Sequence, residues 1–317
     1  MLSLATSLAL LASISHASPI LQTRQTNETN PFVFTNSNGL NFTQMNASLP
    51  NVAIFATGKS PSHPTRTHPN VSLGGTIAGS SSSSTATAGY TAGALGIMTL
   101  ISAVPELLNV SNVAGIQISN VGSEDVTSTI LLTLAKQINK YVCQDDTMAG
   151  AVVTHGTDVL EETAFFLDAT VNCGKPVVVV GAMRPATAIS ADGPFNLLEA
   201  VTVAVSPEAK DRGAMVVMND RITSAYYVTK TNANTMDTFR APEQGHLGAL
   251  LSNTPYFYYP PVKPTGKREY VVDNVTSIPR VDILFAYEDM HSDTLYNAVK
   301  SGAKGVVVSF MSLESLS

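Results

Sequence analysis

Short runs of β-branched and aliphatic residues alternate along this chain with segments of helical periodicity. The clearest apolar runs predict strands at residues 52–56, 114–119, 150–154, 176–181 and 214–219. Between them, Ile130, Leu131, Leu134 and Ile138 share one helical face, and helical spacing recurs over residues 159–171 and 194–205. Because strands alternate with helices, we predict an α/β fold with a mostly parallel sheet flanked by helices.

The alternation begins near residue 51 and divides the chain into segments. Residues 18–50 are polar, rich in Asn and Thr, and predict a mobile arm. After the main domain, residues 51–254, a Pro-rich linker over 255–279 leads to a second α/β pattern in residues 280–317. That pattern, with strands at 281–286 and 305–310 around a helix at 292–301, predicts a second domain that is cut short.

The first residues predict a secretory signal peptide. Residues 8–14 are largely apolar, and Ser15-His16-Ala17 offers a small-residue cleavage site, so residues 1–17 would be removed. A bilayer span needs about 20 apolar residues, and neither this run nor any later one is long enough, so we expect no membrane partner. The predicted location is therefore outside the cell, in the cell wall or in a periplasm-like compartment.

Secretion changes how the two cysteines and the sequons are interpreted. Outside the cell a Cys143–Cys173 disulfide is expected, and two buried free thiols are the alternative. Sequons that would make this a glycoprotein begin at Asn27, Asn41, Asn46, Asn70, Asn109 and Asn274.

Charge and composition exclude several classes of ligand. The net charge of −6 and the lack of a Lys/Arg cluster argue against a nucleic-acid partner. The histidines show no ligand spacing with Cys or carboxylates, so we expect no metal and no other cofactor. Residues 53–60 loosely fit a phosphate-binding loop, but the spacer is an apolar strand, and Pro61 and Pro64 oppose the helix that should follow. A nucleotide-binding α/β protein is the alternative that ATP and Mg²⁺ would stabilise.

Two turns that carry threonine are the best candidates for chemistry. Residues 74–79 read Gly-Gly-Thr-Ile-Ala-Gly, and residues 154–158 read Thr-His-Gly-Thr-Asp after an apolar run. The second turn places Thr157 and Asp158 at the carboxyl end of a strand, where α/β sheets bind ligands. Threonine is a weak nucleophile unless a neighbour removes its proton and a donor network stabilises the oxyanion.

Partners for such chemistry are present elsewhere in the chain. Lys230 and Asp158 could form a buried charged pair that activates either Thr76 or Thr157, and Tyr90 lies in a Ser-, Thr- and Gly-rich segment that suits a lid. Taken singly, each also has a plain structural interpretation: a turn residue, a core aromatic or a solvated strand end. We interpret His155 as a structural histidine.

Four motifs together resemble the secreted type II L-asparaginases: the two threonine turns, Gly-Ala-Met-Arg-Pro at 181–185 and Ser-Ala-Asp-Gly-Pro at 190–194. The similarity extends through residues 218–220 and 228–232 and covers most of 51–309. It implies that Thr76 attacks the side-chain amide of L-asparagine with help from Tyr90, forming an acyl-enzyme and releasing ammonia. Water then yields L-aspartate.

The resemblance also implies the remaining site residues. Thr157, Asp158 and Lys230 match a second catalytic group, and Cys143 and Cys173 match the disulfide of bacterial members. Ser123 and Asp158 match positions that hold the α-carboxylate and α-amine, the Ala182 backbone would lie beside the amide, and Glu124 would tune tolerance for glutamine. The full set of implied substrate-binding residues is Gly75, Ser123, Glu124, Gly156, Thr157, Asp158 and Ala182.

The chain departs from that family at two places. Residues 59–74 separate the first strand from Thr76, so either they form a loop or residues 70–73 replace 52–56 as the strand; a retained intron would explain them. The family's second domain builds the dimer interface of a homotetramer, and here it stops early, so we expect poor stability, weak activity or none, and a doubtful tetramer. A glutaminase-leaning enzyme and a non-catalytic asparagine- or aspartate-binding remnant stay as alternatives.

Overall fold

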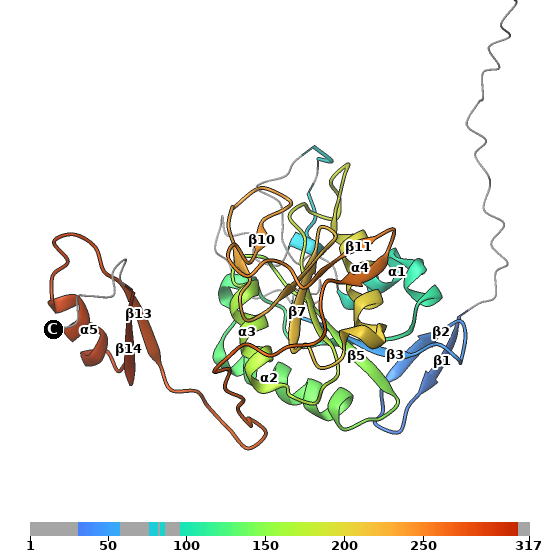
Figure 1. Ribbon diagram of the computed structural model, residues 1–317, viewed down its shortest axis with the longest axis horizontal. Helices are drawn as coiled ribbons and strands as arrows, with labels where there is room; N and C mark the ends of the chain where they lie inside the picture. The colour runs from blue at the N-terminus through green and yellow to red at the C-terminus, as the bar shows by residue number, and fades with distance from the viewer. Residues whose placement is uncertain (1–30, 58–75, 82, 86–95, 310–317) are drawn as a thin grey trace, which may run out of the picture. The chain divides into compact units, whose positions relative to one another are not determined.

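A ten-stranded sheet organises the computed structural model, which describes residues 31–57, 76–81, 83–85 and 96–309 (Figure 1). In spatial order the strands are β1 (Phe32–Thr35), β2 (Asn41–Gln44), β4 (Asn112–Gln117), β3 (Asn51–Ala56), β5 (Met148–Thr154), β6 (Val177–Val180), β7 (Ala214–Met218), β8 (Arg221–Ser224), β11 (Gly248–Leu251) and β12 (Thr254–Phe257).

The five central strands, β4-β3-β5-β6-β7, are parallel, and the strands on either side of them are antiparallel. β6 and β7 are buried along their whole length, as expected for apolar strands covered on both faces. The structure therefore confirms the α/β fold with a parallel core. All five strands predicted from the apolar runs are present, with ends shifted by at most two residues.

Helices cover the sheet: α1 (Ile97–Ala103), α2 (Ser128–Ile138), α3 (Leu160–Thr170) and α4 (Gly193–Val205). α4 packs against β5, β6 and β7, while α3 packs against β6, β7 and α2. Short helical turns complete the layer: η1 (Thr76–Ala78), η2 (Pro105–Asn109), η3 (Ser123–Asp125), η4 (Asn139–Cys143) and η5 (Pro207–Ala209). In α2 the buried face is formed by Leu132, Leu134, Ala135 and Ile138, so the predicted face was correct only for its last two members.

Residues 32–44 differ from the expected mobile arm, because they form the β1–β2 hairpin. Phe34 and Phe42 stack with ring centroids 5.0 Å apart, and Phe42 is fully buried. Thr43 pairs with Val113 of β4, which adds the hairpin to the edge of the sheet. The polar composition hid this hairpin, since only a few apolar residues anchor it and the edge that they cover is built from distant residues.

The Pro-rich segment before residue 280 is fastened to the helices. Lys267 Nζ lies 2.8 Å from Asp168 Oδ1, and both side chains are at most 5% exposed. The Tyr270 amide donates to the Ala169 carbonyl, and Lys136 Nζ donates to the Val275 carbonyl. The predicted linker thus runs along α3 and α2 through buried polar contacts.

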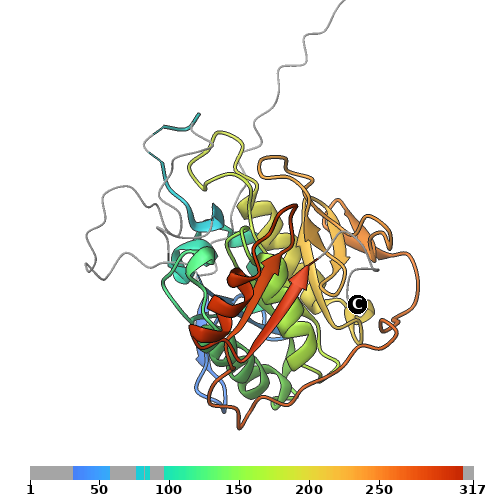
Figure 2. The same cartoon turned by 90° about the vertical axis from the view of Figure 1, so that its left-hand side faces the viewer.

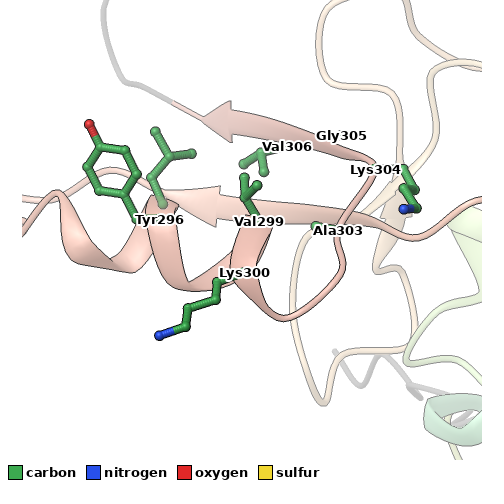
Figure 3. Close-up of a pocket in the computed structure, with 8 residues that line it drawn as sticks. Tyr296, Val299, Lys300, Ala303, Lys304, Gly305 and Val306 are labelled. Atoms are coloured by element: carbon green, nitrogen blue, oxygen red, sulfur yellow. The ribbon is translucent and has the colours of Figure 1, made fainter.

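Two smaller sheets complete the described chain. β9 (Thr229–Lys230) pairs with β10 (Phe239–Arg240), and β13 (Val281–Phe285) pairs in parallel with β14 (Gly305–Ser309). Helix α5 (Asp293–Lys300) connects the last two strands, as the sequence predicted (Figure 2). A groove of about 560 Å³ is lined by residues that include Tyr296 and Val299 of α5 and Gly305 and Val306 of β14 (Figure 3).

Cys143 and Cys173 form the predicted disulfide, with Cα atoms 5.5 Å apart. The bridge joins the end of η4 to the segment after α3 across a sequence separation of 30 residues. The covalent loop so closed contains β5, the turn with Thr157, and α3. Among the described helices, none is long and apolar enough to cross a membrane.

Candidate active site

The site residues gather at the carboxyl ends of β3, β5 and β6. Thr57, directly after β3, is buried, and both its amide and its Oγ1 donate to the Thr154 carbonyl, at 3.3 and 3.1 Å. Asn51–Ala56 therefore occupies the central strand to its end. The inserted residues 59–74 lie outside the described residues, as do two of the predicted site residues, Gly75 and Tyr90.

Thr157 is held by a lysine that comes from a distant part of the chain. Lys230 Nζ, on β9, donates to Thr157 Oγ1 at 3.0 Å and lies 3.0 Å from Asp158 Oδ1. Glu161, in the first turn of α3, fixes this strand by accepting from the Lys230 amide at 2.8 Å and from Thr229 Oγ1 at 2.9 Å. This hydrogen bond joins two residues that are 73 positions apart in the chain.

The charged pair is less buried than the sequence analysis expected. The Lys230 side chain is 15% exposed, but that of Asp158 is 65% exposed. Ser123, buried in η3, accepts a 3.3 Å hydrogen bond from the Asp158 amide, while its neighbour Glu124 is exposed. The Asp158 carboxylate therefore faces solvent beside a buried hydroxyl, an arrangement that suits the charged groups of a small amino acid.

His155 forms hydrogen bonds that connect the Thr157 turn to α3. Its ring is buried, with Nδ1 2.7 Å from the Gly156 carbonyl and Nε2 2.9 Å from Thr163 Oγ1. Burial lowers the pKa of His155 to about 4, although the contact with the Gly156 carbonyl opposes that shift. A neutral ring with both nitrogens hydrogen-bonded agrees with the structural role expected for this histidine.

Thr76 begins the 3₁₀ turn η1 and is buried. The segment that follows it runs beside the segment after β6: the Ala186 amide donates to the Gly79 carbonyl at 2.9 Å, and the Ser81 amide donates to Thr187 Oγ1 at 2.8 Å. The two threonine turns therefore approach each other through residues 181–187.

Two glycines allow this close approach. A Cβ on Gly193 would lie 3.0 Å from Ile77 Cγ1 and 3.4 Å from Ala182 Cβ, so the start of α4 touches both the Thr76 turn and Ala182. A Cβ on Gly181 would lie 3.2 Å from Thr157 Cγ2. Residues 181 and 182 thus lie between the two threonine turns, with Ala182 fully buried.

The sequence analysis missed three side chains that shape this region: Glu161, Asp192 and Asn196. Glu161 looked like an ordinary acidic residue in the first turn of a helix. Asp192 and Asn196 are separated by one helical turn, and the available signal was the placement of polar residues, Asn196 and Glu199, among the apolar residues of the buried face of α4.

The assembled groups fit hydroxyl chemistry on a small polar substrate. A lysine ammonium donates to one threonine hydroxyl, the turn that begins with a second threonine packs with Ala182 against Gly193, and a carboxylate faces outward. Within the described residues, no cluster of three or more His, Cys, Asp or Glu could hold a metal ion.

Comparison with known proteins agrees with this chemistry. The family model of the asparaginase N-terminal domain matches residues 71–263. Probable L-asparaginase 1 of Schizosaccharomyces pombe is 51% identical over 287 residues, which is 90% of this chain and 75% of the relative. L-asparaginase 2-3 of Saccharomyces cerevisiae is 44% identical over 305 residues, or 95% of this chain and 74% of the relative.

A solved structure is also similar, and it corrects one prediction. The probable cytoplasmic L-asparaginase of Campylobacter jejuni has a TM-score of 0.73 and 42% identity, covering 82% of this chain and 75% of that one. The predicted extracellular location is wrong on this finding, because a protein named as cytoplasmic shares the fold. The prediction rested on the apolar run and the cleavage site in residues 1–17, which lie outside the described residues.

Proposed function

Because this chain belongs to the asparaginase family, we propose that it hydrolyses the side-chain amide of L-asparagine to L-aspartate and ammonia. The observation that carries the proposal is the contact of Lys230 with both Thr157 and Asp158, at 3.0 Å each, next to the Gly181–Ala182 peptide. A lone lysine and a lone threonine are common, but this contact joins residues from separate elements at the carboxyl end of a parallel sheet.

In the proposed reaction, Thr76 Oγ1 attacks the amide carbon while its proton passes to a neighbouring base. The carbon–nitrogen bond breaks, the leaving nitrogen takes up a proton, and ammonia departs from an aspartyl ester on Thr76. Water then attacks the ester and restores the hydroxyl. Thr157, with Lys230 donating to its oxygen, is placed to relay a proton in one of these steps.

The substrate's charged ends have matching groups. The Asp158 carboxylate is open to solvent and suits the α-ammonium, while Ser123 lies directly beside it and suits the α-carboxylate as a hydroxyl donor. In this proposal the backbones of Gly156 and Ala182 contact the substrate between its charged end and Thr76. Glu124, exposed next to Ser123, is proposed to tune the tolerance for glutamine.

Ammonia release with asparagine and with glutamine tests the proposal. We expect turnover of asparagine that falls by at least about 1,000-fold in Thr76→Ala, because the nucleophile is lost. Comparable turnover of glutamine would identify a glutaminase-leaning enzyme. Thermal stabilisation by aspartate without any ammonia release would contradict the proposal and indicate a binding protein.

A further inference from the structure

The Ser-Ala-Asp-Gly-Pro motif at residues 190–194 has no role in the reaction described so far. Its aspartate, Asp192, is the N-cap residue of α4, yet its side chain makes no capping hydrogen bond to the helix. Both carboxylate oxygens point elsewhere: Oδ2 accepts from the Met183 amide at 2.8 Å, and Oδ1 accepts from the Arg184 amide at 2.9 Å. An ordinary helix cap would bind the helix's own amides.

Asn196, one helical turn later, holds the other side of the same peptide segment. Its Nδ2 donates to the Gly181 carbonyl and to Asp192 Oδ2, both at 3.1 Å, and its Oδ1 accepts from the Asn219 amide at 3.1 Å. Asn196 is 3% exposed, so its side chain forms these hydrogen bonds within the protein. The N-cap residue and one residue of α4 therefore fix the backbone on both sides of Ala182, at Gly181, Met183 and Arg184.

Ala182 itself is the exception in this segment. It is fully buried, and within the described part of the chain no hydrogen bond uses its amide or its carbonyl. A buried peptide group is costly when it lacks a partner, and with none among the described residues this one is a candidate to bind an incoming group. Its Cβ lies against the position of Gly193, next to the Thr76 turn.

We infer that Asp192 and Asn196 are positioning residues that hold the Ala182 carbonyl where it accepts a hydrogen bond from the amide nitrogen of the substrate. This inference rests on the proposed function. Two positioning side chains are expected for a geometric reason. A misplacement of about 1 Å in a group that orients the reacting amide can lower the rate about 100-fold. Apolar packing alone would not fix the direction of one carbonyl.

The experiment compares two substrates on the same enzyme samples: L-asparagine and the β-methyl ester of L-aspartate. Both carry the same acyl group, but the ester has no N–H to donate to Ala182. The variants are Asn196→Leu, which removes the donor to Gly181, and Asp192→Asn, which leaves only one acceptor for two amides. The matched control is Glu199→Gln, three residues further on the same buried face and bonded to the Asp220 amide instead.

We expect kcat for asparagine to fall about 10- to 100-fold in both variants while ester hydrolysis falls less than about threefold, so the amide-to-ester ratio drops by about tenfold. Glu199→Gln should leave the ratio unchanged. Because the ratio is measured within one sample, partial unfolding cancels. Equal losses for both substrates, or no loss, would overturn the inference while the proposed function stands. A wild-type chain that hydrolyses neither substrate would overturn the proposed function itself.

Discussion

The two threonine turns are fixed by different means. The Thr157 turn lies inside the loop closed by the Cys143–Cys173 disulfide, rests on buried His155, and receives Lys230 from a distant strand. The Thr76 turn is held by backbone hydrogen bonds to the segment after β6 and by close packing against Gly193. The Thr157 turn is thus fixed by a disulfide and a lysine contact. The Thr76 turn depends on Gly193, where a larger residue would press against Ile77.

Because of this difference, two kinds of substitution should impair the site in different ways. Changes in charge should act through Thr157, and changes in volume should act through Thr76. The sequence motifs alone make the turns look equivalent, since each is a glycine-rich segment with one threonine.

Lys230→Met should lower kcat by about 1,000-fold, because the variant removes the donor to Thr157 and the charge beside Asp158. Its thermal stability should change little, since the Asp158 side chain is 65% exposed and stays solvated. Steady-state kinetics and a melting curve measure both quantities. Activity within tenfold of wild type would remove Lys230 from the catalytic group.

Lys267→Met is the matched control, because this lysine also pairs with an aspartate, but that aspartate lies in α3 and not in the Thr157 turn. The Asp168 partner is buried, so losing the lysine should destabilise the protein by about 3–5 kcal/mol. Activity per folded molecule should be retained. If both lysine variants lost activity equally, the effect would be one of folding and the contrast would fail.

Opening the disulfide should weaken the Thr157 side of the site. Replacing Cys143 and Cys173 by alanine removes a bridge across 30 residues, which should cost roughly 3 kcal/mol of unfolding free energy. Denaturant unfolding of the variant and of wild type measures this cost. Limited proteolysis should cut first within residues 143–173; first cuts elsewhere would show that the disulfide does not secure this turn.

Acid should loosen the same turn through His155. The folded pKa is about 4 and the unfolded value is about 6.5, so between these pH values the unfolded chain binds more protons. Stability from this group is present above pH 6.5 and is lost as pH falls to 4, by about 3 kcal/mol in total. Unfolding free energies at several pH values should show this slope, and His155→Gln should flatten it.

The contribution of Glu199 to stability changes with pH in the opposite direction to that of His155, so the two contributions must be measured separately. Burial, with a further contribution from Asp220, raises the pKa of Glu199 to about 8, so its stabilising effect is lost as pH rises from about 4.5 to 8. Glu199→Gln removes this term and should raise stability at pH 8 relative to wild type. The acid slope of His155 is best measured in that background; a slope that vanished there would contradict its assignment.

The smallest expected effects come from two glycine substitutions. Gly193→Ala would place a Cβ 3.0 Å from Ile77 and should shift the Thr76 turn, lowering kcat about tenfold and stability by about 1 kcal/mol. Gly181→Ala would press on Thr157 and Leu160 instead. Gly305→Ala, where the nearest atom is 3.4 Å away, is the control and should be silent. Equal activity in all three would show that packing does not set the Thr76 position.

Much of the fold was decided locally, and the sequence alone was enough to predict it. The apolar runs that became β5, β6 and β7 are buried on both faces, so their composition left few other structures open. The β1–β2 hairpin was missed because its strands are short and polar, and they pair only when the edge of β4 exists. The composition of residues 32–44 cannot predict this pairing, because Thr43 pairs with Val113, about 70 positions later in the chain.

The sequence by itself was enough to predict the family and its type of reaction. The threonine turns and the motifs around them consist of particular residues in a particular order, and such residues can be read directly from the chain. Only the tertiary structure decided which groups meet. It brought Lys230 to Thr157, left Asp158 open to solvent, and aimed Asp192 and Asn196 at the peptide around Ala182. Hydrogen bonds between distant residues depend on the packing of whole elements, and no spacing along the chain encodes their direction.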